Sequence, residues 1–94
     1  MLANQNERWI FIKGFSPLGK IQKQAVLSYS CEKQGPTEYC FSLVRDCEGN
    51  TTQESTQVYD IKEEQALQMV RFLYENAIPI ENWQDVLKEL EQQL

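Results

Sequence analysis

Residues 25–43, AVLSYSCEKQGPTEYCFSL, decide the fold of this 94-residue chain. Apolar side chains alternate on both sides of the turn sequence KQGP at 33–36, which predicts antiparallel strands over about 21–32 and 37–46. Bringing the two apolar sets onto one side of the sheet pairs odd-numbered with odd-numbered positions. That side is predicted to face the core. The two sets are Ala25, Leu27, Tyr29 and Cys31, and Tyr39, Phe41 and Leu43.

Two further strands flank this hairpin in the sequence. The apolar run at 9–12 predicts a strand over 8–15 that is buried on both faces, or that has one edge under a helix. The turn sequence SPLG follows at 16–19. After a second turn at 47–50, the Thr-rich segment 51–59 is polar enough to be a solvated edge strand.

The rest of the chain has the periodicity of two helices. Asp60 is the predicted N-cap of the first, with Glu63 completing a capping box. Pro79 ends that helix, and Asn82 is the predicted N-cap of the second. The first apolar stripe is Ala66, Leu67, Val70, Leu73, Tyr74 and Ala77, and the second is Trp83, Val86, Leu87, Leu90 and Leu94. Each stripe predicts a helix packed on a core.

Four strands joined by short turns are antiparallel, and two amphipathic helices at one end of the chain must cover one face of their sheet. The predicted fold is therefore a single α+β domain over residues 1–94, a four-stranded antiparallel sheet covered on one face by two C-terminal helices. A chain of this length leaves no room for a second domain.

The composition excludes several kinds of chemistry. The chain has no histidine, which removes Cys/His zinc sites, histidine general bases and Ser-His or Cys-His nucleophiles. Glycine-rich phosphate loops are also absent from the sequence. Catalysis would have to use carboxylates alone, and the candidate carboxylate pairs 63/64, 46/48 and 81/85 lie on predicted polar faces or turns. We expect no cofactor, no metal and no enzymatic activity.

The three cysteines form no C-x-x-C motif. The predicted register places Cys40 on the opposite face from Cys31, so we expect reduced thiols rather than a disulfide. The N-terminal residues are polar, and the run at 9–12 is too short for a signal peptide or a membrane span. A cytoplasmic protein is expected.

Charge is distributed unevenly along the chain, whose net charge is −5. Residues 1–50 carry six basic and five acidic side chains, whereas residues 51–94 carry three and nine. Such a chain is not expected to bind nucleic acid directly, but it can dock on a basic protein surface. Ordinary solvated helix faces would give the same charge pattern.

Met69 lies at the margin of the first helical stripe, and Phe72 lies off it, so Phe72 is either an interface anchor or covered by another segment. The candidate partner-binding residues are Phe72 and the carboxylates of Glu75, Glu81, Asp85 and Glu89. Spaced acids on rigid helices can imitate the phosphates of nucleic acid.

The segments VYDI at 58–61, IPI at 78–80 and DVL at 85–87, with the helix between them, resemble a small, functionally uncharacterised domain family of Firmicutes proteins. The resemblance covers about residues 40–94. Lys62 stands where that family usually has a small polar residue. The resemblance implies a bacterial or phage setting and carries over no catalytic residue.

Two functions of different classes follow. The first is a small binding protein, most concretely a phage or mobile-element inhibitor of the anti-CRISPR kind, whose acids block a basic nucleic-acid-binding surface of a partner. The second is a regulatory or structural protein of the bacterial cytosol that forms a homodimer or larger homo-oligomer. It would pair through the edge 51–59 or through the apolar stripe of 83–94.

Overall fold

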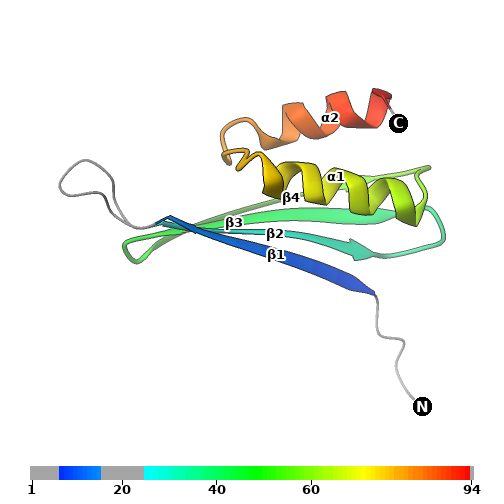
Figure 1. Ribbon diagram of the computed structural model, residues 1–94. Helices are drawn as coiled ribbons and strands as arrows, with labels where there is room; N and C mark the ends of the chain where they lie inside the picture. The colour runs from blue at the N-terminus through cyan, green and yellow to red at the C-terminus, as the bar shows by residue number, and fades with distance from the viewer. Residues whose placement is uncertain (1–6, 16–24, 94) are drawn as a thin grey trace, which may run out of the picture.

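The computed structural model describes residues 7–15 and 25–93. Both helices lie on one side of a single antiparallel sheet with strand order β1-β2-β3-β4 (Figure 1). This confirms the predicted α+β fold. The predicted turn at 16–19 and the first part of the second predicted strand, 21–24, lie outside the described residues. The elements in chain order are β1 (Arg8–Phe15), β2 (Ala25–Lys33), β3 (Tyr39–Cys47), β4 (Asn50–Val58), α1 (Glu63–Glu75) and α2 (Trp83–Gln93).

The register of the central hairpin follows the odd-with-odd rule. Tyr29 lies opposite Leu43, and Cys31 lies opposite Phe41. The β3–β4 connection is a two-residue turn in which Glu48 and Gly49 both have positive φ, 51° and 86°. Such turns match the right-handed twist of a hairpin. β4 is an edge strand, as predicted, although it ends one residue earlier than expected.

The core lies between the sheet and the helices. Odd-numbered side chains of β2 and β3 face it, and α1 and α2 supply the other layer. Met69, predicted at the margin of the α1 stripe, is fully buried, because α2 packs against α1 on the flank away from β1. The largest fully buried side chains are Trp83, Tyr29, Tyr39, Phe41, Leu43 and Met69.

β1 is apolar on both faces, but only one face is covered. Trp9 and Phe11 pack against the core, and the Phe11 ring lies 5.4 Å from that of Tyr74 on α1. Ile10 and Ile12 point to the other face of the sheet and are 53% and 62% exposed. The strand is therefore not buried on both faces, which was one of the two predicted alternatives, and one of its faces packs against the core under the helices.

The start of α1 corrects the predicted N-cap. The helix begins at Glu63, and Lys62 has the extended backbone of an N-cap, with φ −94° and ψ 161°. The Lys62 backbone N–H donates to the Gln65 side chain at 2.8 Å. Asp60 instead has a φ of 61°, a left-handed conformation that Asp tolerates better than most residues. This turn allows Ile61 to be buried in the core, which the local capping pattern could not foresee.

Lysine cannot accept a hydrogen bond, so the N-cap position of α1 holds an unfavourable residue. Lys62→Ser is expected to raise the free energy of unfolding by about 1 kcal/mol, because a serine oxygen would accept a free N–H of the first turn. Urea denaturation measures this change. Lys88→Ser, which removes the same charge from the exposed face of α2, should give no gain. Equal gains in the two variants would show that charge, not capping, is responsible.

α1 ends in a left-handed residue and α2 begins shortly afterwards. Ala77 has a φ of 48°, and the Ile78 N–H donates to the Leu73 carbonyl at 3.0 Å, as in a Schellman motif. Pro79 follows, in agreement with the predicted break. α2 begins at Trp83, directly after the predicted cap at Asn82.

The apolar stripe of α2 is used inside the fold. Trp83 and Leu87 are buried, and Val86 and Leu90 pack against the core. Much of the stripe predicted as an intermolecular interface for 83–94 is therefore occupied inside the fold, and its last residue, Leu94, lies outside the described residues.

Candidate functional site

The exposed aromatic of the helical layer is Phe72, which is 40% exposed. Tyr74 identifies the flank of α1 that faces β1, because its ring contacts Phe11. Residues two positions apart, such as Phe72 and Tyr74, are separated by about 200° around a helix. Phe72 therefore lies on the opposite flank of α1, toward α2. Part of the layer's outer surface is thus apolar.

The hollow beside Phe72 is shallow. Its lining residues, Gln68, Arg71, Phe72 and Glu75, all belong to α1, so the hollow is a groove between side chains of one helix. A small-molecule site needs groups that converge from several elements around an enclosed space. This groove suits contact with another protein better than binding of a small ligand.

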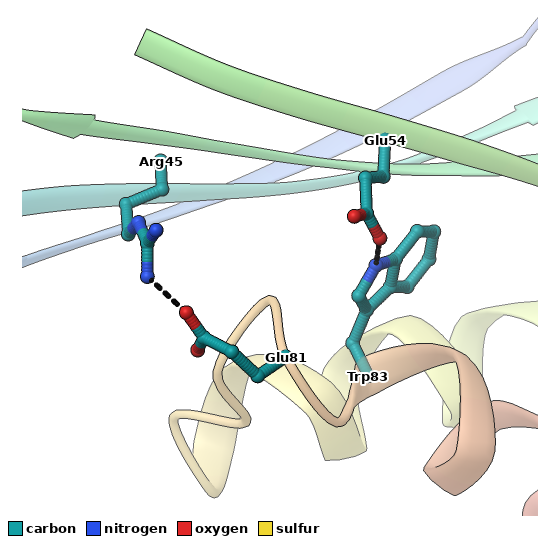
Figure 2. Close-up of polar contacts among 4 residues, drawn as sticks. All are labelled: Arg45, Glu54, Glu81 and Trp83. Carbon is teal, nitrogen blue, oxygen red and sulfur yellow. Dashed lines mark hydrogen bonds and ion pairs between the residues drawn. The ribbon is translucent and has the colours of Figure 1, made fainter. Parts of the chain in front are cut away.

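Two of the four predicted carboxylates are held by arginines. Arg71 donates to Glu75 one turn later on α1, at 3.3 Å. Arg45 on β3 donates to Glu81, in the turn before α2, at 2.7 Å (Figure 2). The hydrogen bond from Arg45 lowers the pKa of Glu81. Much of the negative charge at these two positions is balanced within the chain.

Asp85 and Glu89 lie differently. Both are exposed, and their spacing of four residues places them one turn apart on the side of α2 opposite Trp83 and Leu87. Within residues 7–15 and 25–93, neither carboxylate makes an ion pair or a side-chain hydrogen bond. All four candidate carboxylates are exposed, but within the described residues only Asp85 and Glu89 have no arginine partner.

The beginning of α2 is fastened to the sheet by a contact that sequence reasoning missed. The Trp83 indole N–H donates to Glu54 of β4 at 2.8 Å, and the Gln84 side chain donates to the same oxygen at 3.1 Å. Figure 2 shows this contact beside the Arg45–Glu81 pair. Glu54 lies opposite the buried Leu43, so its side chain is on the face of the sheet that the helices cover. The sequence of this strand is polar almost throughout and does not single out Glu54. The Trp83–Glu54 and Arg45–Glu81 contacts tie the first residue of α2 to β4 and the turn before α2 to β3.

The thiols and carboxylates do not assemble a reactive centre in the described part of the chain. Cys31, Cys40 and Cys47 are free, and Cys31 and Cys40 lie on opposite faces of the sheet as predicted. Burial, with a smaller effect of Cys40, raises the pKa of Cys31 to about 12, so its reactive thiolate is scarce at neutral pH. Among these residues, no three Cys, Asp or Glu side chains gather as metal ligands would.

Neither helix of the described chain has the length and apolarity that crossing a bilayer requires. No protein-family model, no curated protein and no solved structure matches this chain.

Proposed function

We propose that this chain is a small non-enzymatic protein that binds a partner protein through the outer surface of its helices. The binding surface consists of Phe72 on α1 and of Asp85 and Glu89 on α2, and is called the helical surface below. The observation that carries the proposal is the pair of accessible carboxylates on a helix whose opposite side is fixed in the core. A rigid helix presents charged groups at low conformational cost.

The partner's surface should be basic. The chain carries a net charge of −5, and the acids of the helical surface add a local negative field to it. Phe72 would supply the apolar contact that fixes the orientation, as buried aromatics do at many interfaces. The arginine-paired Glu75 and Glu81 contribute less, because their charge is partly balanced.

The concrete form of this function is an inhibitor from a phage or mobile element, of the anti-CRISPR kind. It would cover a basic nucleic-acid groove of a partner protein without binding nucleic acid itself. The small acidic chain and the acids spaced along α2 support this form. A chain without histidine is also easier to explain as a binding protein than as a hydrolase.

The test is capture of partners by the tagged chain from a bacterial lysate that contains a CRISPR effector. A basic, nucleic-acid-binding protein should be retained at low salt and lost as salt rises, because exposed charges are screened. Glu89→Lys and Phe72→Ala should each weaken retention about tenfold or more while the chain still unfolds cooperatively. Glu91→Lys is the matched control. It makes the same charge change on the flank of α2 shared with Gln84, and should weaken retention less.

Retention that does not change between low and moderate salt would contradict the electrostatic mechanism. Equal losses for Glu89→Lys and Glu91→Lys would contradict the helical surface, because net charge alone would then explain binding.

A further inference from the structure

The outer edge of β1 is the most apolar edge of this sheet. β1 is the first strand in the order, and within the described residues nothing pairs with its free side. Trp9 and Phe11 line one face of it, and the exposed Ile10 and Ile12 line the other. Soluble proteins usually protect such an edge, because its unpaired backbone groups attract another strand.

The direction of the free backbone groups follows from the ladder. The Lys33 N–H donates to the Glu7 carbonyl at 2.8 Å, so residues 7 and 33 form a hydrogen-bonded pair. Hydrogen-bonded and non-hydrogen-bonded pairs alternate along an antiparallel ladder. The odd-numbered residues of β1 therefore bond to β2, and the even-numbered residues direct their N–H and C=O groups outward. Arg8, Ile10 and Ile12 offer these groups to a new strand.

We propose that two copies of this chain pair through antiparallel β1 strands. The two Ile10 residues face each other across the two-fold axis. The two four-stranded sheets then become one continuous sheet. In this register the even-numbered residues form the hydrogen-bonded pairs, Ile10 with Ile10 of the second copy and Arg8 with Ile12. It agrees with the direction of the free groups, and a two-fold arrangement uses the same patch on both copies.

Side-chain chemistry selects this register. On the helix-covered face it places Glu7 opposite Lys13 of the second copy, and Trp9 opposite Phe11, each pair occurring twice. These are the non-hydrogen-bonded pairs, in which side chains approach more closely. Opposite charges and paired aromatics stabilise facing strands. Lys13 already lies on this face, with its ammonium 4.7 Å from the centre of the Tyr74 ring.

The β4 edge is a poorer site for self-pairing. Its residues are polar along almost the whole strand, and Val58 at its end is buried in the core. A second β4 would gain backbone hydrogen bonds but little apolar burial, and apolar burial drives most association. The structure therefore favours β1 over the edge 51–59 expected from the sequence.

Cysteine cross-linking tests the register directly, in a chain with Cys40→Ser and Cys47→Ser. In the proposed dimer, Ile10→Cys places two thiols on residues whose Cα atoms are about 5.5 Å apart, within disulfide range. Ile12→Cys is the matched control. Its two thiols lie about four residues apart along the strands, or roughly 13 Å, and cannot be joined. Under mild oxidation, a covalent dimer is expected for the variant at position 10 and not for that at position 12.

A charge swap provides a second test that needs no cross-link. Glu7→Lys and Lys13→Glu each place like charges opposite one another twice, and should raise the dimer dissociation constant roughly tenfold. The double variant restores both ion pairs and should recover the original value. Sedimentation equilibrium over a range of concentrations measures these constants.

A monomeric mass at concentrations up to about 1 mM would overturn the proposal, since even a weak dimer forms there. Cross-linking of the position-12 variant but not the position-10 variant would also overturn it, because another register would be present. These outcomes do not depend on whether the helical surface binds a partner.

Discussion

Replacing Trp83 by alanine is expected to lower the free energy of unfolding by about 3–5 kcal/mol. The side chain is fully buried at the point where α2 meets the sheet, and its indole N–H donates to Glu54. Truncation would leave a cavity in the core and remove one of the two contacts that fasten α2 (Figure 2). A 94-residue domain has a total stability of roughly 5–14 kcal/mol, so this loss is a large part of it. Thermal and urea denaturation followed by circular dichroism measure the change.

Two variants separate the packing of Trp83 from its hydrogen bond. Trp83→Phe keeps most of the ring volume but removes the donor, and should cost about 1–2 kcal/mol, since Gln84 still donates to Glu54. Phe72→Ala truncates an aromatic that is 40% exposed, and should cost less than Trp83→Ala by at least about 2 kcal/mol. A similar loss for Phe72→Ala and Trp83→Ala would place Phe72 in the core, and it could then no longer serve as an interface anchor.

The fold could be predicted because its strongest signals are local. The alternation around Tyr29 and Phe41 sets both the register and the buried face of the central hairpin. The helical periodicity of 63–75 and 83–93 then requires a second layer. Apolar residues repeat every two positions in a half-buried strand and about every 3.6 positions in an amphipathic helix. These patterns can therefore be recognised in the sequence without knowledge of distant contacts.

The features that sequence reasoning missed depend on residues far apart in the chain. Arg45 and Glu81 are 36 positions apart, and no local pattern indicates that they meet. Helical periodicity alone puts Met69 at the margin of a stripe, because that periodicity does not show where α2 packs. Asp60 fits the local motif of a cap, but in the structure it has a positive φ, the N-cap is Lys62, and Ile61 between them is buried in the core. Glu75 is different, because its partner Arg71 lies only one helical turn away, at a spacing that favours an ion pair.

The two fully buried tyrosines of the sheet should respond in opposite directions to the same substitution. The Tyr29 hydroxyl donates to the Ile78 carbonyl at 2.9 Å, which ties β2 to the segment after α1. The buried Tyr39 hydroxyl has no hydrogen-bond partner in the part of the chain that the structure describes. A buried polar group without a partner loses the free energy of its hydration and gains nothing in return.

Tyr29→Phe is therefore expected to lower the free energy of unfolding by about 1–2 kcal/mol, because it leaves the Ile78 carbonyl without its donor. Tyr39→Phe is expected to raise it by about 1 kcal/mol, because it removes an unpaired hydroxyl and keeps the ring. Each variant is the control for the other, since both lose one oxygen from a residue with no exposed surface. Urea denaturation of the two variants beside the wild type gives both values.

Alkaline titration gives an independent check on the burial of Tyr29. Burial raises the pKa of Tyr29 from its ordinary 10.0 to about 12, so the unfolded chain loses this proton at a lower pH than the folded one. The contribution of the protonated Tyr29 hydroxyl to the free energy of unfolding is fully present below pH 10 and is lost as the pH rises from there to about 12. Tyr29→Phe should lose less stability over this interval than the wild type. If Tyr39→Phe instead proved as destabilising as Tyr29→Phe, the Tyr39 hydroxyl would have a bonding partner, and the opposite signs expected here would be wrong.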